Sequence, residues 1–282
     1  MTRFMLNFLL GLNLWQLTVV VLGIAFAVGL GLSVGIRKLF RLNPSAAQAD
    51  LAIDLMQVTS TYIGILLAFA GVLAWQDNRD AASAVENEAG VASLLYRDLA
   101  AYGPEMDTAR KDLKTYIHNV VAYGWPLLRA GKRSPEVENE LLIVFDDVAA
   151  VTPTNARQSA IYQECFSQLN QLVSMRRQRI AASRAEIPPV LWIVALVGSL
   201  LTITYASAFV SSRYASLMIS GASLTIGLLF LFLLSVEYPF RSRNGVTPQP
   251  FVELEPLFEK IDRARITTVS SSPASPAPAP RE

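Results

Sequence analysis

The chain has few of the side chains that enzymes and metal proteins use. Its 282 residues include a single cysteine, Cys165, and a single histidine, His118. A disulfide needs two cysteines and a zinc site needs several cysteine or histidine ligands, so one chain can form neither. Walker, HExxH, CxxC, nucleophile-elbow and kinase signatures are also missing. We therefore expect no enzymatic activity, no cofactor and no metal site, with Cys165 as a small core residue.

Charged residues are scarce as well. They make up 17% of the chain, against 52% hydrophobic residues, whereas soluble domains are about one-quarter charged. The formal net charge is +1, which provides no basic surface for nucleic acid. This composition is typical of a membrane protein, whose expected surrounding partner is the lipid bilayer.

The chain does have four long apolar runs, at about 14–36, 55–75, 190–210 and 214–236. Each has close to the roughly twenty residues that cross a hydrocarbon core, and none holds an Asp, Glu, Lys or Arg in its interior. The first run is longer than the core of a signal peptide, so we interpret it as an uncleaved span. Ion-coupled transporters usually carry buried charges in their spans, so this absence favours a passive pore over a coupled transporter.

The residues between the second and third runs are polar and patterned as helices. No helix breaker follows Trp75 until Gly103-Pro104, so span two is expected to continue to about Tyr102, a helix of roughly 70 Å. Prolines predict three further helices, at about 104–129, 135–152 and 155–187, the first with a kink or stop at Trp125-Pro126.

Two apolar stripes mark the expected core-facing sides of these helices. The stripe on the continuation of span two consists of Val85, Ala89, Ala92, Leu95 and Leu99. The stripe on the last helix consists of Tyr162, Phe166, Leu169, Val173, Ile180 and Ile187.

The predicted fold is therefore all-α: a polytopic membrane protein with four transmembrane helices and a cytosolic helical bundle inserted between spans two and three. The expected parts are a first transmembrane pair (1–75), the cytosolic insert (76–187), a second transmembrane pair (188–238), a C-terminal amphipathic segment (239–268) and a disordered Pro/Ser/Ala tail (269–282). For the amphipathic segment, docking on the insert and lying on the membrane surface are both open.

Basic residues near the span ends predict the orientation. The side with both termini and the insert carries more arginines than the other side, which favours cytoplasmic termini. The Arg37-Lys38-Arg41 cluster on the opposite side argues against it. The expected location is a bacterial inner membrane.

Small residues recur along the first two spans, where they permit close approach of helices. We expect them to pack helices within or between subunits, with a polar lining of a permeation path as the alternative. They are Gly23, Ala27, Gly31 and Gly35 in span one, and Gly64 and Ala68 in span two.

The opposite face of span two carries large side chains at spacings of four, three and four: Tyr62, Leu66, Phe69 and Leu73. Lipid contact or core packing explains such a face. The alternative is that these side chains, repeated around a symmetric oligomer, form a hydrophobic constriction that closes by dewetting.

Charged residues of the insert form a second candidate cluster. If the two long helices run antiparallel, equal counts from Trp75 and Pro188 predict that Glu86 or Glu88 pairs with Arg176 or Arg177. In the alternative, these arginines together with Arg179 form a positive vestibule that concentrates anions.

Local motifs in a shared order carry a family resemblance over about residues 50–260. They are Tyr62-Ile63-Gly64, Leu67-Ala68-Phe69, Trp75, Val85-Glu86-Asn87-Glu88-Ala89, Leu94-Leu95-Tyr96, Tyr116, Trp125-Pro126, Arg176-Arg177-Gln178-Arg179-Ile180, Ile187-Pro188, Trp192 and Pro239-Phe240. With these motifs the chain resembles the bestrophin-like family of bacterial and plant membrane proteins. Gly124 departs from the pattern, because an acidic residue is expected before the Trp-Pro pair.

Bestrophins are pentameric anion channels whose second helix lines the pore, so the resemblance implies a homo-oligomer, a pentamer by analogy, that passes chloride or other small anions. It does not extend to calcium gating, since Arg241-Ser242-Arg243 follows Pro239-Phe240 where animal bestrophins have an acidic cluster. The leading hypothesis is a passive anion channel. The competing one is a non-conducting, membrane-anchored protein whose cytosolic bundle binds a partner.

Overall fold

The computed structural model describes residues 9–40, 45–184, 187–207, 213–243 and 245–270. Within these ranges every regular element is a helix and no strand occurs. Four of the helices are long and apolar enough to cross a membrane. The protein is thus an all-α membrane protein with four spanning helices, as the sequence predicts.

The chain divides into two compact units. The membrane unit consists of Met1–Ala82 and Ala182–Val246, and the polar unit of Ser83–Ala181 and Thr247–Glu282. Helix α3 (Ala46–Tyr102) contributes its first part to the membrane unit and the remainder to the polar unit.

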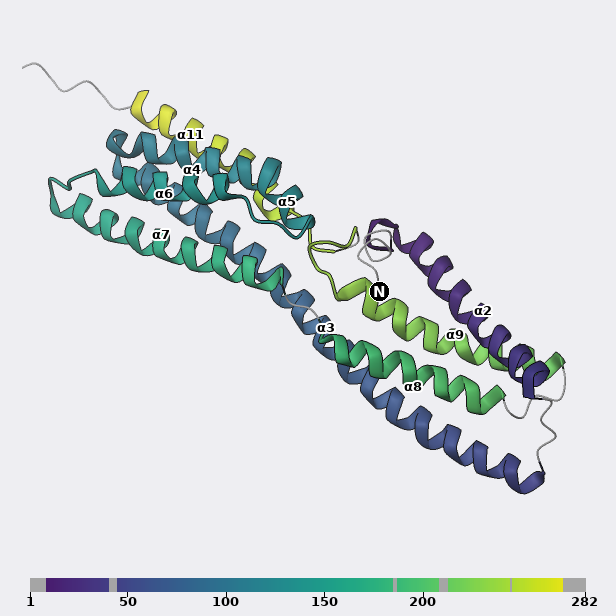
Figure 1. The fold of residues 1–282 in the computed structure, drawn as a ribbon. Coiled ribbons are helices and arrows are strands. Elements are labelled where there is room, and N and C mark those ends of the chain that lie inside the picture. Colours follow the sequence, from purple (N-terminus) through teal and green to yellow (C-terminus); the bar gives the residue numbers. More distant parts are fainter. Residues whose placement is uncertain (1–8, 41–44, 185–186, 208–212, 244, 271–282) are drawn as a thin grey trace, which may run out of the picture. The chain divides into compact units, whose positions relative to one another are not determined.

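Close backbone approach joins α2 (Leu14–Phe40) to α9 (Arg213–Val236) in the membrane unit, where the two helices lie side by side (Figure 1). A Cβ atom on Gly29 would overlap Ser223, and one on Gly227 would lie 2.6 Å from the Cβ of Ala25. Glycine at these positions permits the van der Waals contact that holds helices together in lipid.

Helix α3 packs against α8 (Pro189–Ser207) and α9 through one apolar cluster. Its buried members in these helices are Leu67, Ala70, Ala74, Ala195, Leu233 and Val236. Near the end of α9, Trp192 donates a hydrogen bond from Nε1 to Glu237 Oε1 at 2.7 Å. One face of α3 is therefore committed to the core of the membrane unit.

The small-residue stripe predicted for helix packing faces away from this core. Among the described residues, nothing lies within 4 Å of a Cβ built on Gly23, Gly31, Gly35 or Gly64. Packing inside the chain uses the buried Gly29 on a neighbouring face of α2 instead. The contact between α2 and α9 uses Gly29 and Gly227, and packing of the predicted stripe, between subunits, stays a prediction.

The polar unit is a bundle of helices in which α4 lies between α6 and α11 (Figure 1). After α3 the chain forms η1 (Pro104–Met106), α4 (Asp107–Asn119), a π-helical turn η2 (Val120–Gly124), α5 (Trp125–Arg129), α6 (Pro135–Ala149), α7 (Ala156–Ala182), α10 (Gln249–Val252) and α11 (Leu254–Ser270). All five residues of the stripe predicted on the continuation of span two are buried in this bundle.

Two helix ends in the polar unit follow from local chemistry. Ser134 caps α6 by accepting a hydrogen bond from the Val137 N–H at 3.4 Å. Just before Trp125-Pro126, where a kink or stop was predicted, the chain widens into the π-helical turn η2, and it then continues as α5. A wider turn makes room for Pro126, which lacks an N–H and crowds an α-helix.

The stripe predicted on the last helix of the insert is largely wrong. Helix α7 buries Cys165, Gln168, Leu169, Leu172, Arg176 and Arg179, so that only Leu169 is common to both sets. The prediction followed apolar residues only, whereas two arginines are buried here because carboxylates lie beside them. Ile187 lies beyond the end of α7.

The C-terminal amphipathic segment docks on the rest of the polar unit. Phe251 and Phe258 are fully buried, and the Phe258 ring stacks on Tyr96 with centroids 3.8 Å apart. Asp262 then accepts hydrogen bonds from the Tyr96 hydroxyl at 2.8 Å and from Arg110 Nη2 at 2.6 Å. Of the two open placements, docking on the insert is the one observed. Of the tail predicted to be disordered, residues 271–282 lie outside the described ranges.

Replacing Phe258 with Ala should weaken this docking. The change removes a fully buried ring stacked on Tyr96, so unfolding of the polar unit should become easier by about 3–5 kcal/mol. Thermal unfolding of the purified protein, with limited proteolysis at the C-terminus, measures the effect. Leu257→Ala is the matched control, because that side chain is 39% exposed. Equal losses for the two variants would contradict the stated packing.

Candidate functional site

The outer face of α3 in the membrane unit is the first candidate site. Tyr62 and Phe69 are about two-thirds exposed, at 70% and 68%, and Leu73 is also exposed. Leu66 is partly buried, because it packs against the apolar cluster that α3 shares with α8 and α9. The structure thus places three of the four predicted constriction residues together on a face that the other described residues leave uncovered, with Leu66 at its edge.

A buried ion pair in the polar unit is the second candidate site. Glu88 of α3 is fully buried, and Arg179 of α7 approaches it with Nε 2.6 Å from Oε2 and Nη2 3.1 Å from Oε1. The Tyr116 hydroxyl of α4 donates a further hydrogen bond to Glu88 Oε1 at 2.8 Å. Both carboxylate oxygens are therefore satisfied, which a buried charge requires.

Arg179 is charged in the folded protein. Burial by itself lowers the pKa of a guanidinium, but the adjacent Glu88 carboxylate outweighs burial and raises the pKa of Arg179. Burial, and secondarily the charge of Glu88, raises the pKa of Tyr116 well above its usual value. Tyr116 therefore remains a hydrogen-bond donor, and the three side chains tie α3, α4 and α7 together.

The predicted pairing named the right acid and the wrong base. Glu88 pairs with Arg179, and Glu86 and Arg177 are exposed. The prediction assumed that the helix continues to Pro188 and counted residues back from there. Helix α7 ends at Ala182, so the residues of α7 are shifted along α3 relative to that count, and Arg179 lies beside Glu88.

The other predicted arginine lies near a different carboxylate. Arg176 is buried on the same side of α7 as Arg179, with its Nη1 3.8 Å from Glu138 Oε1. Residues three apart share a helix face, whereas Arg177 is turned about 100° away from Arg176. The Glu138 contact is too long for a hydrogen bond.

Sequence reasoning missed Tyr116 as part of this site. Two features of the sequence point to it. Glu88 lies within the apolar stripe of Val85, Ala89 and Ala92, so its burial and its need for donors follow from the helical period. A tyrosine among the apolar positions of the next helix is a suitable partner, because a buried hydroxyl also needs one.

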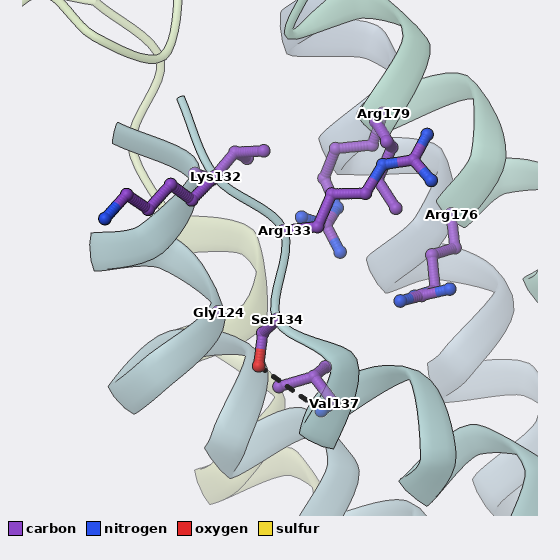
Figure 2. A pocket seen from close by; sticks show the side chains of 9 residues that line it. Gly124, Lys132, Arg133, Ser134, Val137, Arg176 and Arg179 are labelled. Carbon is purple, nitrogen blue, oxygen red and sulfur yellow. Dashed lines mark hydrogen bonds between the residues drawn. The ribbon is translucent and has the colours of Figure 1, made fainter. Parts of the chain in front are cut away.

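A small pocket opens beside this ion pair, with a volume of about 20 Å³. Figure 2 shows Arg133, Arg176 and Arg179 on one side of it and Lys132 on the other. The remaining lining residues are Gly124, Leu128, Ser134, Val137 and Ile180. Neither Lys132 nor Arg133 was predicted, because both lie in the short connection between α5 and α6.

Asp147 of α6 is a partly buried carboxyl group that interacts with Asp112 of α4. Burial, followed by the hydrogen bond and charge of Asp112, raises the pKa of Asp147 to about 6. Asp146 adds a smaller contribution in the same direction. Two carboxylates this close cannot both be ionised without repulsion, so Asp147 holds a proton at mildly acidic pH.

The described residues offer little for enzyme chemistry. Among them, no group of three or more His, Cys, Asp and Glu side chains could hold a metal ion. Cys165 is fully buried, and burial raises the pKa of its thiol to about 12, so this thiol is a poor nucleophile.

A double-mutant cycle at Glu88 and Arg179 tests the buried pair. Glu88→Gln and Arg179→Gln should each lower the free energy of unfolding by about 3–5 kcal/mol, because each leaves the other charge buried without its counter-ion. The double variant should lose clearly less than the sum of the two. Glu86→Gln, on the exposed face, should be close to neutral. Additive losses in chemical denaturation would show that the two side chains do not interact.

Asp147→Asn should change how stability depends on pH. The pKa of Asp147 is raised above 3.8, so its stabilising contribution is complete below about pH 4 and is lost as pH rises through about 6. The Asn variant should therefore unfold at a higher temperature than the wild type at about pH 8 and at a similar temperature at about pH 4. Asp146→Asn removes the same charge from an exposed neighbour and should have a smaller effect. Parallel pH profiles for wild type and Asp147→Asn would refute the raised pKa of Asp147.

Comparison with known proteins agrees with this architecture. The structure is similar to the crystal structure of a variant of a bacterial bestrophin homolog from Klebsiella pneumoniae, with a TM-score of 0.58 and 15% sequence identity over 89% of this chain and 98% of that chain. At this identity the similarity shows the fold alone. No curated protein matches the sequence. Residues 23–251 match the Bestrophin-like domain. Because this match covers well over half of the chain, the protein belongs to the Bestrophin-like family.

Proposed function

We propose that this protein is a passive, anion-permeable channel formed by several copies of the chain, with the outer face of α3 lining the path. The observation that carries the proposal is the position of Tyr62, Phe69 and Leu73. They lie on the uncovered side of a helix whose other side is buried against α8 and α9. In a ring of subunits, that side of α3 is available to face the axis.

The chemistry of this face suits a constriction that excludes water. Phe69 and Leu73 present no polar atoms, and Tyr62 adds a ring with one hydroxyl. A ring of such side chains in a narrow pore closes it by dewetting, without a moving lid. No Asp, Glu, Lys, Arg or His lies between Leu55 and Trp75, so no charged side chain in this stretch binds a passing ion strongly. Anion preference and a pentameric ring are inferred from family membership.

The exposed small residues of α2 provide a surface for contact between subunits. Gly23, Ala27, Gly31 and Gly35 are exposed in the single chain, and small residues at this spacing let helices of neighbouring subunits approach closely. The arginine distribution supports an orientation in which both termini and residues 76–187 face the cytoplasm of a bacterial cell.

Chloride flux into liposomes containing the purified protein tests the proposal. The wild type should conduct, and Phe69→Ala should raise the flux several-fold, because a smaller side chain weakens the hydrophobic barrier. Ile24→Ala is the matched control, since this α2 side chain is also exposed, at 57%, and lies outside the proposed path. Subunit number is measured on the same preparation.

The outcomes separate a channel from an anchor. A conducting wild type whose flux is unchanged by Phe69→Ala would remove that residue from the path. A symmetric oligomer that passes no anion, both as wild type and as Phe69→Ala, would favour the alternative: a non-conducting protein that the spans hold in the membrane while the polar unit binds a partner.

A further inference from the structure

The pocket beside the buried ion pair has an unusual lining. Of its nine lining residues, four are cationic and none is acidic: Lys132, Arg133, Arg176 and Arg179. None of the acids nearby is a lining residue. Glu88 pairs with Arg179, Glu136 accepts a hydrogen bond from Ser134 at 2.9 Å, and Glu138 lies 3.8 Å from Arg176. The pocket wall therefore presents positive charge to whatever enters.

The second, independent observation concerns the hydrogen bonding of Arg176. The residue is 9% exposed, and within the described part of the chain its buried Nε has no hydrogen-bond partner. A buried guanidinium donor without an acceptor is costly, and such donors are normally satisfied by protein, water or ligand. Arg179 directs Nε and Nη2 to Glu88, and its Nη1 takes no part in those two hydrogen bonds. The Nη groups of Arg176, which form no hydrogen bond within the described residues, and the Nη1 of Arg179 are thus the guanidinium donors that these two residues can offer at this pocket.

From this geometry we propose that the arginine pocket (Lys132, Arg133, Arg176 and Arg179) is a binding site for a phosphate-type oxyanion. Guanidinium groups match the oxygens of phosphate in both charge and shape, and they form two hydrogen bonds at once. The enclosed volume of about 20 Å³ is close to that of one or two waters. The pocket is also partly open, with exposed Lys132 and Arg133 in its lining, so a single oxyanion group can sit at it and a whole metabolite cannot be enclosed. The ligand is therefore free inorganic phosphate or one phosphoryl group of a larger molecule. The site lies wholly in the polar unit, and its existence does not depend on conduction.

The test measures binding of inorganic phosphate to the purified full-length protein. Calorimetry gives the affinity, and the shift of the unfolding temperature gives the stabilisation. Phosphate should bind saturably and raise the unfolding temperature, and sodium chloride at equal ionic strength should not reproduce the effect. Arg176→Gln should weaken binding by about tenfold or more, since it removes charge-assisted hydrogen bonds. Arg177→Gln is the matched control: it removes the same charge from the next residue, which is exposed and does not line the pocket.

Two further variants keep the test decisive if Arg176→Gln does not fold. Arg133→Gln removes a lining charge at an exposed position. Gly124→Glu adds a negative charge to the lining, and a Cβ at Gly124 meets its nearest neighbours at an ordinary 3.6 Å. Both should abolish or strongly weaken phosphate binding while the protein stays folded.

Three results would overturn the proposal: no saturable binding of phosphate, an equal effect of chloride, or an equal loss of binding in Arg177→Gln. ADP distinguishes the two sources of the oxyanion. If ADP binds more tightly than phosphate and loses affinity in Arg133→Gln, the site takes a phosphoryl group of a larger molecule. If ADP binds no better, the ligand is the free ion.

Discussion

The buried carboxylate of Glu88 is the constraint on which the polar unit depends. A charge with no exposed surface is tolerated only when its oxygens receive donors. Here Arg179 supplies two hydrogen bonds and Tyr116 a third. These donors come from α7 and α4, so satisfying one carboxylate fixes the register of three helices. An apolar core tolerates small sliding of its helices, whereas this arrangement does not, because a shift of one residue would leave a charge without its partner.

The same helix meets opposite requirements in the two units. Within the membrane α3 must avoid charge, and it carries no Asp, Glu, Lys, Arg or His from Leu55 to Trp75. It binds its neighbours there through Leu67, Ala70 and Ala74, and close packing replaces the hydrophobic effect as the source of stability. In the polar unit water competes for every polar contact, so the helix combines an apolar stripe with one fully paired charge. This division follows from the solvent around each part.

Sequence reasoning was strongest where the period and length of a pattern settle the structure. Four uncharged apolar runs predicted four spans, and the stripe from Val85 to Leu99 predicted the buried side of α3. Sequence reasoning failed where a contact depends on which residue of a second helix lies opposite. The choice of Arg179 over Arg177 rests on the end of α7 at Ala182. The choice of Gly29 over Gly31 rests on which face of α2 meets α9, and steps of two and four residues along a helix leave both faces plausible.

Charge placement in the polar unit also explains how Arg179 can pair with Glu88 and still contribute to the proposed phosphate site. Arg179 is held by Glu88 and cannot turn away, so its position is fixed in advance of any ligand. Arg176 has only a long contact with Glu138, and Arg133 is exposed on a connection between helices. A rigid cation beside two less constrained ones resembles a preorganised anion site, in which one donor is already oriented and the others adjust. Structural pairing of Glu88 with Arg179 is therefore compatible with anion binding at the same arginine, because the two uses engage different sides of one guanidinium.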